Sequence, residues 1–316
     1  MIAISGPAIL IHSRFLAARL EDWRPGDYPF CTLDDVAGEV PPHLAQSIEV
    51  LVSGGETLDN ALVDSLPRLR LVACFSTGYA GIDLAHLRER GIALTSAGGV
   101  NAHDVADHAV ALLLAWWHGI VPSDRLVREG GWRDGTPARR SLRGKKAGVV
   151  GLGRIGRAIA DRLAAHDIEV GYWGPREKPD SRYPRATSLV DLAEQSDILV
   201  VASRAVPENA KQIDAEVLRA LGQGGVLINV SRGFLVDEQA LIAALRDGTI
   251  AGAALDVFED EPTDPALWHG LGNVVLTPHL AGYTLEAGQA MFGQLRENIR
   301  RYLSGEALLS PVEDVG

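Results

Sequence analysis

The sequence predicts an α/β fold built of two doubly wound, Rossmann-like parallel-sheet domains with a cleft between them. Short apolar runs alternate with helical stretches along the chain, which is the rhythm of strand–helix–strand units on a parallel sheet. A polar, glycine-containing loop over residues 129–144 divides these units into two series. The chain has 316 residues, and single domains mostly hold about 100–200 residues, so two domains are expected.

The first series supplies one domain. Apolar runs at residues 48–52 and 69–75 indicate strands, and residues 85–90 indicate a helix. Residues 101–118 form a long, mostly apolar helical stretch with Asn101 as its candidate N-cap. We expect this helix to act as the hinge between the domains.

The second series begins after the polar loop, and its strands are nearly continuous in apolar character. Such strands are typical of a sheet that helices cover on both faces. We expect them at residues 147–150, 169–172, 198–201, 226–229, 251–255 and 273–277, followed by a helix at 285–303. One domain would then comprise residues 1–98 and 284–316, and the other residues 99–283.

The composition indicates a folded protein with little affinity for polyanions. Hydrophobic residues make up 47% of the chain and charged residues 22%, with a formal net charge of −11. This charge disfavours nucleic acid and anionic membranes as partners, because those need clustered Lys and Arg. The N-terminus lacks the pattern of a signal peptide, and no apolar run approaches the ~20 residues that span a bilayer. Because only Cys31 and Cys74 are present, we expect a soluble protein of the reducing cytoplasm.

A glycine-rich turn follows the first strand of the second series. Gly151, Gly153 and Gly156 form a G-x-G-x-x-G pattern between that strand and a helical stretch. The first glycine permits a tight turn, the second lets the backbone approach a pyrophosphate, and the third packs helix on strand. Arg154 and Ile155 complete the predicted coenzyme loop. The alternative is that the glycines only shape a turn, but their context favours a dinucleotide site.

The end of the next strand bears on the choice of coenzyme. An NAD enzyme usually offers an acidic residue there, about 20 residues past the loop, for the ribose hydroxyls. This chain instead has Arg176 and Lys178, with Glu177 between them. The two cations favour NADP(H), while NAD(H) stays possible, and a solvated charged turn is the alternative interpretation.

Three charged residues follow predicted strands of the second sheet. Arg232, Glu261 and His279 each come shortly after a strand, and the carboxyl ends of strands are where doubly wound sheets bind ligands. Together they offer a cation for a carboxylate, a proton donor and a partner for that donor. Each residue alone would be read as an ordinary surface or loop residue. No set of His, Cys and carboxylate residues has the spacing of a metal site.

Several motifs along the chain together match one known family. In the second domain they fill the stretch from Glu216-Val217-Leu218 through Pro278-His279, and in the first domain they are Ser53-Gly54-Gly55, Gly78-Tyr79 with Ile82-Asp83, and Val105-Ala106-Asp107-His108-Ala109. On these motifs most of the chain resembles the D-2-hydroxyacid dehydrogenase family, particularly its glyoxylate/hydroxypyruvate and hydroxyphenylpyruvate reductase branch.

The resemblance implies roles for individual residues. His279 would be the general acid, Glu261 would orient its imidazole, and Arg232 would hold the substrate carboxylate and carbonyl. Asp256 would face the nicotinamide carboxamide, with Val105 and Val230 also at the coenzyme. The substrate would further meet Ser53, Gly54, Gly55 and Gly78, the amides of Gly54 and Gly55 binding its carboxylate. The remaining histidines, His103, His108, His118 and His166 among them, are interpreted as cap or surface residues.

Two positions bear on specificity and assembly. Gly282 stands where the family commonly has a serine that touches substrate, and the bulky Tyr283 follows it. Trp132 lies in a loop that in related reductases crosses a dimer interface and reaches the neighbouring substrate site. On this basis we expect a homodimer, and a core-packing tryptophan is the equal alternative.

The sequence thus predicts an NAD(P)-dependent oxidoreductase that reduces a small 2-keto acid, glyoxylate or hydroxypyruvate first, to the D-2-hydroxy acid. The chemistry is expected in the cleft between the domains. One alternative is a phosphoglycerate dehydrogenase-like enzyme. Another is a dinucleotide-sensing, corepressor-like scaffold on the same fold, which keeps the same three charged residues.

Overall fold

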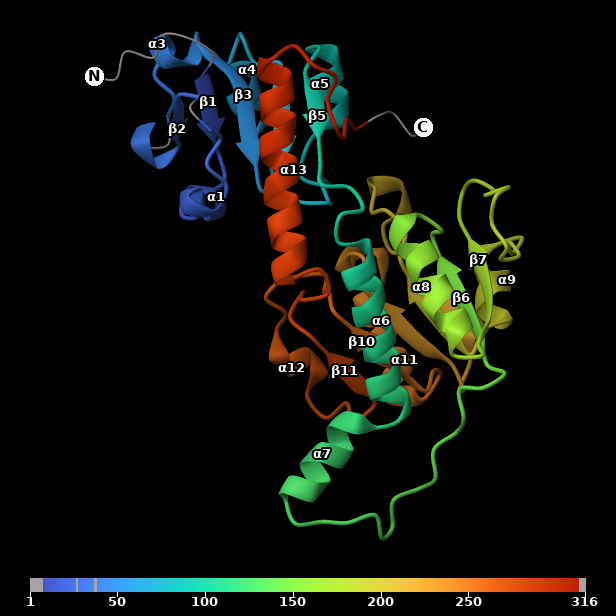
Figure 1. Ribbon diagram of the computed structural model, residues 1–316. Coiled ribbons are helices and arrows are strands. Elements are labelled where there is room, and N and C mark those ends of the chain that lie inside the picture. The colour runs from blue at the N-terminus through green and yellow to red at the C-terminus, as the bar shows by residue number, and fades with distance from the viewer. Residues whose placement is uncertain (1–7, 27, 37–38, 313–316) are drawn as a thin grey trace. The chain divides into compact units, whose positions relative to one another are not determined.

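The computed structural model describes residues 8–26, 28–36 and 39–312. The chain divides into two compact units, unit 1 with Met1–Asn101 and Thr284–Gly316, and unit 2 with Ala102–Tyr283. Each unit has its own parallel sheet (Figure 1). The predicted class, α/β with two parallel-sheet domains, is confirmed.

Unit 1 is built on a five-stranded parallel sheet with the order β2-β1-β3-β4-β5. Its order reverses between β1 and β3, and a reversal of this kind leaves a crevice for ligands at the carboxyl ends of the two strands. The strands are β1 (Ala8–Ile11), β2 (Phe30–Thr32), β3 (Ile48–Ser53), β4 (Leu71–Cys74) and β5 (Ala93–Thr95).

Unit 1 contains segments from both ends of the chain, and a helix of the C-terminal segment packs with strands of the N-terminal segment. The long helix α13 (Leu285–Leu303) places Phe292, Leu295 and Ile299 in one apolar cluster with buried residues of β1, β3 and β4. The C-terminal segment is therefore part of the core of unit 1. The shorter helices are α1 (Arg14–Ala17), α2 (Leu20–Trp23), η1 (Asp34–Val36), α3 (Pro42–Ala45), α4 (Asn60–Asp64) and α5 (Leu84–Glu89).

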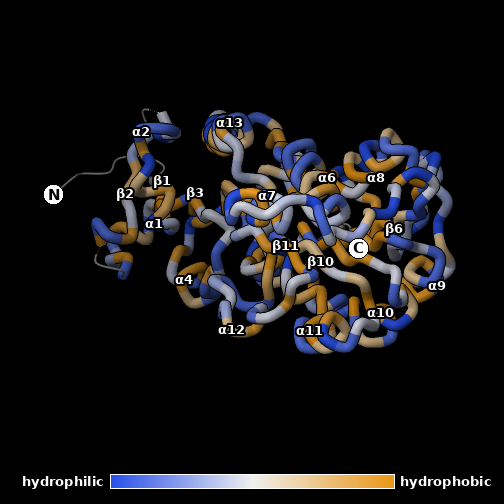
Figure 2. Tube along the Cα trace, turned by 90° about the horizontal axis from the view of Figure 1, so that it is seen from below, coloured by the Kyte–Doolittle hydropathy of each residue, from blue (hydrophilic) through white to orange (hydrophobic). Residues whose placement is uncertain are grey.

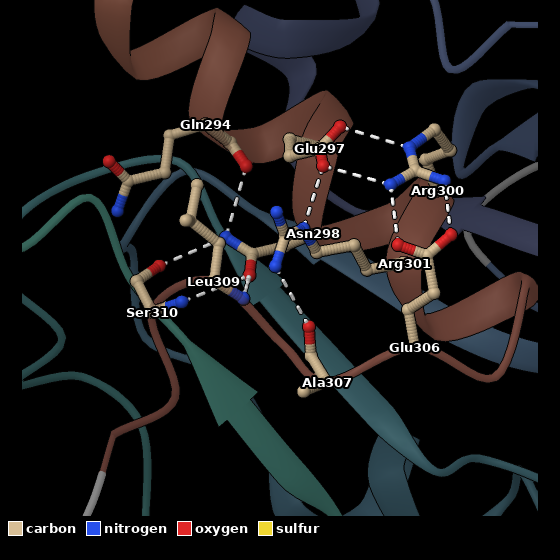
Figure 3. A network of polar contacts seen from close by, with 9 residues as sticks. All are labelled: Gln294, Glu297, Asn298, Arg300, Arg301, Glu306, Ala307, Leu309 and Ser310. Atoms are coloured by element: carbon tan, nitrogen blue, oxygen red, sulfur yellow. Dashed lines mark hydrogen bonds and ion pairs between the residues drawn. The ribbon is translucent and has the colours of Figure 1, made fainter.

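The C-terminal tail is held to α13 by a polar network (Figure 3). The buried Asn298 accepts hydrogen bonds from the backbone N–H groups of Leu309 and Ser310, at 2.9 and 3.2 Å, and donates to the Ser310 hydroxyl. Arg300 pairs with both Glu297 and Glu306 at the end of the helix. These contacts fix the turn that returns the tail toward β5.

Unit 2 contains a six-stranded parallel sheet with the order β11-β10-β9-β8-β6-β7. The order reverses between β6 and β8, so the predicted coenzyme loop after β6 lies at the position where such sheets bind ligands. The strands are β6 (Lys146–Val150), β7 (Glu169–Trp173), β8 (Ile198–Val201), β9 (Val226–Asn229), β10 (Gly252–Leu255) and β11 (Val274–Leu276). All six predicted strands of this series are present, and no end differs from the prediction by more than one residue.

Apolar clusters cover both faces of this sheet. Figure 2 shows apolar stretches within the body of unit 2 and hydrophilic stretches around its outside. This burial explains why the strands read as continuous apolar runs. The helices are α6 (Ala102–Trp117), α7 (Ile120–Arg128), α8 (Arg154–Ala165), α9 (Leu189–Glu194), η2 (Pro207–Asn209), α10 (Ala215–Leu221), η3 (Gly233–Leu235), α11 (Glu238–Asp247) and α12 (Pro265–Trp268).

The start of α6 differs from the sequence expectation. The predicted cap, Asn101, is buried, and its Oδ1 atom has no hydrogen-bond partner among the described residues. Asn101 therefore precedes the first residue of α6 as predicted, but its side chain does not cap the helix. Within the described ranges no single helix could cross a membrane, although α6 and α7, bent by 58°, pass that test as a joined pair.

Candidate active site

The glycine loop has the geometry that a bound pyrophosphate requires. Gly151 has φ +91°, and a Cβ there would collide with the backbone of Ser203. A Cβ on Gly156 would collide with the carbonyl of Gly151, whereas one on Gly153 would meet nothing within 4 Å among the described atoms. Only the middle glycine thus borders open space, directly at the start of α8, where backbone N–H groups attract anions. The loop fits a dinucleotide.

The other predicted coenzyme residues divide into exposed and buried groups. Arg154 is exposed and Ile155 half-buried at the start of α8. Val105 and Val230 are buried in the same apolar cluster of unit 2. The two valines therefore form part of the packed wall beside the loop.

The turn after β7 is fixed by two residues that the sequence analysis did not single out. The buried Tyr172 hydroxyl accepts a hydrogen bond from the Lys178 backbone N–H at 2.9 Å. Arg185 donates to the carbonyl of Gly174 at 2.8 and 3.2 Å. Arg176 lies exposed in the turn between these anchors. The loop with the two predicted phosphate-binding cations thus has a defined backbone.

Glu261 holds the imidazole of His279. The Nδ1 atom of His279 lies 2.7 Å from Oε2 of Glu261, and the other oxygen of Glu261 accepts from the Phe258 backbone N–H at 3.1 Å. His279 has φ +53°, and its N–H donates to the carbonyl of Asp256 at 2.8 Å. Since Nδ1 is engaged by the carboxylate, Nε2 is the nitrogen that can serve a substrate.

Arg232 lies in the same neighbourhood. Burial lowers the pKa of its guanidinium, and the nearby charge of Glu261 opposes that shift. An arginine stays protonated under such conditions, so a partly buried cation lies close to the histidine–glutamate pair. Its Nη1 donates to the Ser231 carbonyl at 2.7 Å.

The topology of the sheet explains this convergence. Arg232, Glu261 and His279 follow β9, β10 and β11, which are neighbours in the sheet. The buried Asn229 shapes the turn after β9, because its side chain accepts from Ser231 N–H and donates to the Arg232 carbonyl. The structure therefore brings the three sequence-predicted residues together at one edge.

Asp256 anchors the loop that carries His279. Its fully buried carboxylate accepts hydrogen bonds from the Thr277 hydroxyl at 2.6 Å and from the backbone N–H groups of Leu280 and Ala281, both at 2.8 Å. Burial alone would raise the pKa of Asp256, but hydrogen bonds from His108, Thr277 and the two amides outweigh it and lower the pKa. Asp256 is therefore an ionised support of the loop, and its predicted contact with the carboxamide stays a prediction.

His108 belongs to this network. Its Nε2 atom lies 3.0 Å from the Thr277 hydroxyl and 3.4 Å from Oδ1 of Asp256. The interpretation of His108 as a cap or surface residue is wrong. The sequence holds no local signal for this contact, because His108 and Thr277 are 169 residues apart.

The predicted substrate residues of unit 1 lie at the carboxyl ends of β3 and β4. The buried Ser53 hydroxyl accepts from the Gly55 N–H at 3.0 Å, and Gly55 has φ +105°. The Gly78 carbonyl accepts from the Ser76 hydroxyl. The side chain of Glu56 reaches back to Gly54, whose N–H contributes a hydrogen bond to its carboxylate. Both predicted carboxylate-binding amides thus have acceptors within unit 1 itself.

Other features of unit 2 lie apart from these residues. Trp132 is two-thirds exposed in the loop after α7, so it is not packed in the core. A depression of about 370 Å³ is lined by residues at the amino-terminal ends of β6 and β7, among them Lys146 and Glu169. That edge of the sheet is opposite to the glycine loop, and the depression includes none of the predicted site residues.

Comparisons with known proteins agree with this geometry. Residues 110–281 match the model of the D-isomer specific 2-hydroxyacid dehydrogenase NAD-binding domain. Glyoxylate/hydroxypyruvate reductase A of Arabidopsis thaliana is 44% identical, covering 80% of this chain and 82% of that protein. Hydroxyphenylpyruvate reductase of Plectranthus scutellarioides is 42% identical, covering 85% of this chain and 86% of that protein.

A solved structure is similar over nearly the whole length. It is the NADPH-dependent glyoxylate/hydroxypyruvate reductase of Sinorhizobium meliloti in complex with NADP and malonate. The TM-score is 0.87 at 36% sequence identity, covering 98% of this chain and 97% of that one. The chain therefore belongs to the D-isomer specific 2-hydroxyacid dehydrogenases, a family of NAD(P)-dependent 2-keto acid reductases.

Proposed function

We propose that this chain reduces glyoxylate or hydroxypyruvate to the corresponding D-2-hydroxy acid with NADPH as the preferred coenzyme. The observation that carries the proposal is the 2.7 Å contact between His279 Nδ1 and Glu261, with the Arg232 cation beside it. These groups follow neighbouring strands of the sheet that also carries the glycine loop. The substrates named for the relatives above support the choice of small 2-keto acids.

His279 acts as the proton donor in this proposal. NADPH, held at the glycine loop of Gly151, Gly153 and Gly156, would supply the hydride for the keto carbon. His279 gives a proton from Nε2 to the keto oxygen, while Glu261 keeps the ring oriented through Nδ1. Arg232 holds the substrate carboxylate and stabilises the charge that develops on the oxygen. The products are the hydroxy acid and the oxidised coenzyme, and His279 regains its proton from water.

The coenzyme preference rests on the turn after β7. Arg176 and Lys178 offer cations to a 2′-phosphate, and the Tyr172 and Arg185 contacts fix the backbone between them. Cations at this turn are how Rossmann folds accommodate NADP. The S. meliloti reductase, described as NADPH-dependent, supports the same choice.

A spectrophotometric panel tests both parts of the proposal. Glyoxylate, hydroxypyruvate, pyruvate and phenylpyruvate are each combined with NADPH and with NADH, and coenzyme oxidation is followed at 340 nm. Turnover should be highest with glyoxylate or hydroxypyruvate and NADPH. Failure to oxidise either coenzyme with any of the four acids would reject the enzymatic proposal and favour a dinucleotide-sensing scaffold.

We further propose that the chain forms a homodimer through α7 and the loop that follows it. None of the described side chains of α7 is buried, and Ile120, Val121 and Val127 are each more than half exposed, as is Trp132. Apolar side chains gathered in this way usually meet a partner. Light scattering after gel filtration should give a dimer mass for the wild type and for the control Ser123→Lys, and a monomer mass for Val127→Lys combined with Trp132→Lys. A monomeric wild type would reject the dimer.

We also propose the reducing cytoplasm as the compartment. Cys31 and Cys74 are both free and buried in unit 1, which suits a reducing environment. Fractionation of the native cells with an antibody against the chain tests this location.

A further inference from the structure

A histidine–carboxylate pair lies where the strand order of unit 1 reverses. His12 follows β1 and Glu56 follows β3, and these neighbouring strands flank the reversal. Nδ1 of His12 lies 2.9 Å from Oε1 of Glu56, with 17% and 38% of the two side chains exposed. The pair thus lies at the carboxyl edge of the sheet, where parallel sheets of this kind bind ligands.

Hydroxyl and amide groups surround this pair. Ser13 and Ser53, which follow and end the two strands, are almost fully buried. A Cβ placed on Gly54 would come within 2.7 Å of Glu56 Oε2 and 2.8 Å of the Ser13 hydroxyl oxygen. The second oxygen of Glu56 therefore lies directly over Gly54, next to the amides to which the resemblance assigns the substrate carboxylate.

Glu56 is an ionised acceptor at this position. Burial alone would raise its pKa, but the hydrogen bonds from His12 and from the backbone amides of Glu56 and Gly54 outweigh it and lower the pKa. One carboxylate oxygen serves His12, and each carboxylate oxygen has two lone pairs. Glu56 therefore keeps capacity to accept a further hydrogen bond from a ligand.

We propose that the His12–Glu56 pair determines substrate specificity by favouring 2-keto acids with a hydroxyl on the carbon next to the keto group and disfavouring those with a second anionic group. This inference rests on the proposed function and on the role in substrate binding that the resemblance implies for the Gly54–Gly55 edge. The substrate hydroxyl donates a hydrogen bond to Glu56 Oε2, and His12 fixes the position of the Glu56 carboxylate.

The physical basis is a hydrogen bond and a charge. A hydrogen bond to a charged acceptor stabilises the bound substrate that has the hydroxyl. The shorter substrate has no hydroxyl and does not gain this stabilisation. In the proposed function the Arg232 cation compensates the carboxylate that all three acids share, whereas a second carboxylate or phosphate meets the like charge of Glu56 at short range and is repelled. Hydroxypyruvate satisfies both conditions, glyoxylate lacks the hydroxyl, and oxaloacetate adds the second anion.

Two substitutions at Glu56 separate these effects. Glu56→Gln removes the charge but keeps an acceptor, so kcat/KM for oxaloacetate should rise about tenfold while the ratio of kcat/KM for hydroxypyruvate over glyoxylate changes little. Glu56→Ala removes both, so that ratio should fall about tenfold, through KM rather than kcat. The steady-state constants of all three substrates are measured with NADPH.

Asp64→Asn is the matched control. Asp64 pairs with His86 at 2.9 Å in the same unit, on helices α4 and α5 rather than at the strand ends. This variant should leave both discrimination ratios unchanged. A general effect of losing a histidine–carboxylate pair would appear in both Asp64→Asn and Glu56→Gln.

The outcomes separate the specificity proposal from the proposed function. If Glu56→Gln and Glu56→Ala both reduce the three acids with wild-type ratios, the pair has no role in specificity while the reductase activity stands. If the wild type reduces none of the acids, both proposals fall. Thermal melting of each variant shows whether it is folded. If Glu56→Ala does not fold, Glu56→Gln still tests the proposal, because glutamine keeps the shape of the side chain.

Discussion

His279 is held by two neighbours with different tasks. Glu261 binds its ring at Nδ1, and the carbonyl of Asp256 binds its backbone N–H in a left-handed conformation. The ring is thus oriented by a side chain and the backbone by the strand next to it. Such preorganisation matters because a proton donor must lie within hydrogen-bond reach of the reacting oxygen.

Replacing His279 should therefore remove the proton donor without disturbing the coenzyme loop. For His279→Gln we expect kcat to fall by about 10²–10⁴-fold, the usual contribution of general acid–base catalysis. The Kd for NADPH, measured by fluorescence titration, should stay close to that of the wild type. A variant with normal turnover would exclude His279 as the acid.

Tyr172 offers a test of the coenzyme turn. In Tyr172→Phe the Lys178 N–H loses its 2.9 Å acceptor, and a lost hydrogen bond of this kind is worth about 0.5–1.5 kcal/mol. The turn should loosen, and KM for NADPH should rise severalfold more than KM for NADH, because only NADPH has the 2′-phosphate. Equal changes in the two KM values would contradict a role for this turn in coenzyme choice.

The elements themselves follow closely from the sequence, whereas their mutual contacts do not. The strands β8, β9 and β10 could be predicted because burial on both faces makes each one a continuous apolar run. Arg232, Glu261 and His279 could be predicted as neighbours because each follows a strand of one sheet. The contacts of His108 with Thr277 and of His12 with Glu56 join residues far apart in the chain, and no local pattern encodes them. At Asn101 a local pattern is present without the expected contact, because the residue precedes a helix but its side chain does not cap it.

The loop after β11 depends on the charge of Asp256. Because the pKa of this carboxyl is lowered in the folded protein, its stabilising contribution is present above the unfolded value of about 3.9 and is lost as the pH falls through the folded value. Thr277→Val removes one hydrogen bond to the carboxylate and should bring the folded pKa closer to the unfolded one. The midpoint of acid unfolding, followed by circular dichroism, should therefore move to higher pH. The hydroxyl of Thr249 donates in the same way to Asp247, but that carboxylate is fully exposed to solvent. The control Thr249→Val should therefore move the midpoint far less.

Unit 1 is assembled from both ends of the chain, which links its stability to the C-terminal segment. The helix α13 contributes apolar side chains to the sheet of the first hundred residues, and Asn298 ties the following tail to the helix. Unit 2 is one continuous segment with its own core clusters. We therefore expect the two units to respond to different perturbations.

Asn298→Ala combined with NADPH tests this division. The substitution removes the acceptor that the buried Asn298 offers to the N–H groups of Leu309 and Ser310, and each lost hydrogen bond of this kind is worth about 0.5–1.5 kcal/mol. Unit 1 should unfold at a lower temperature in calorimetry, whereas saturating NADPH should raise the transition of unit 2, because a ligand stabilises only the part that binds it. Arg300→Ala, which removes exposed ion pairs from the same helix, should change the first transition far less, since such pairs contribute little. If Asn298→Ala lowers both transition temperatures equally, the two units do not unfold separately. If NADPH raises both transition temperatures, coenzyme binding does not stabilise unit 2 alone.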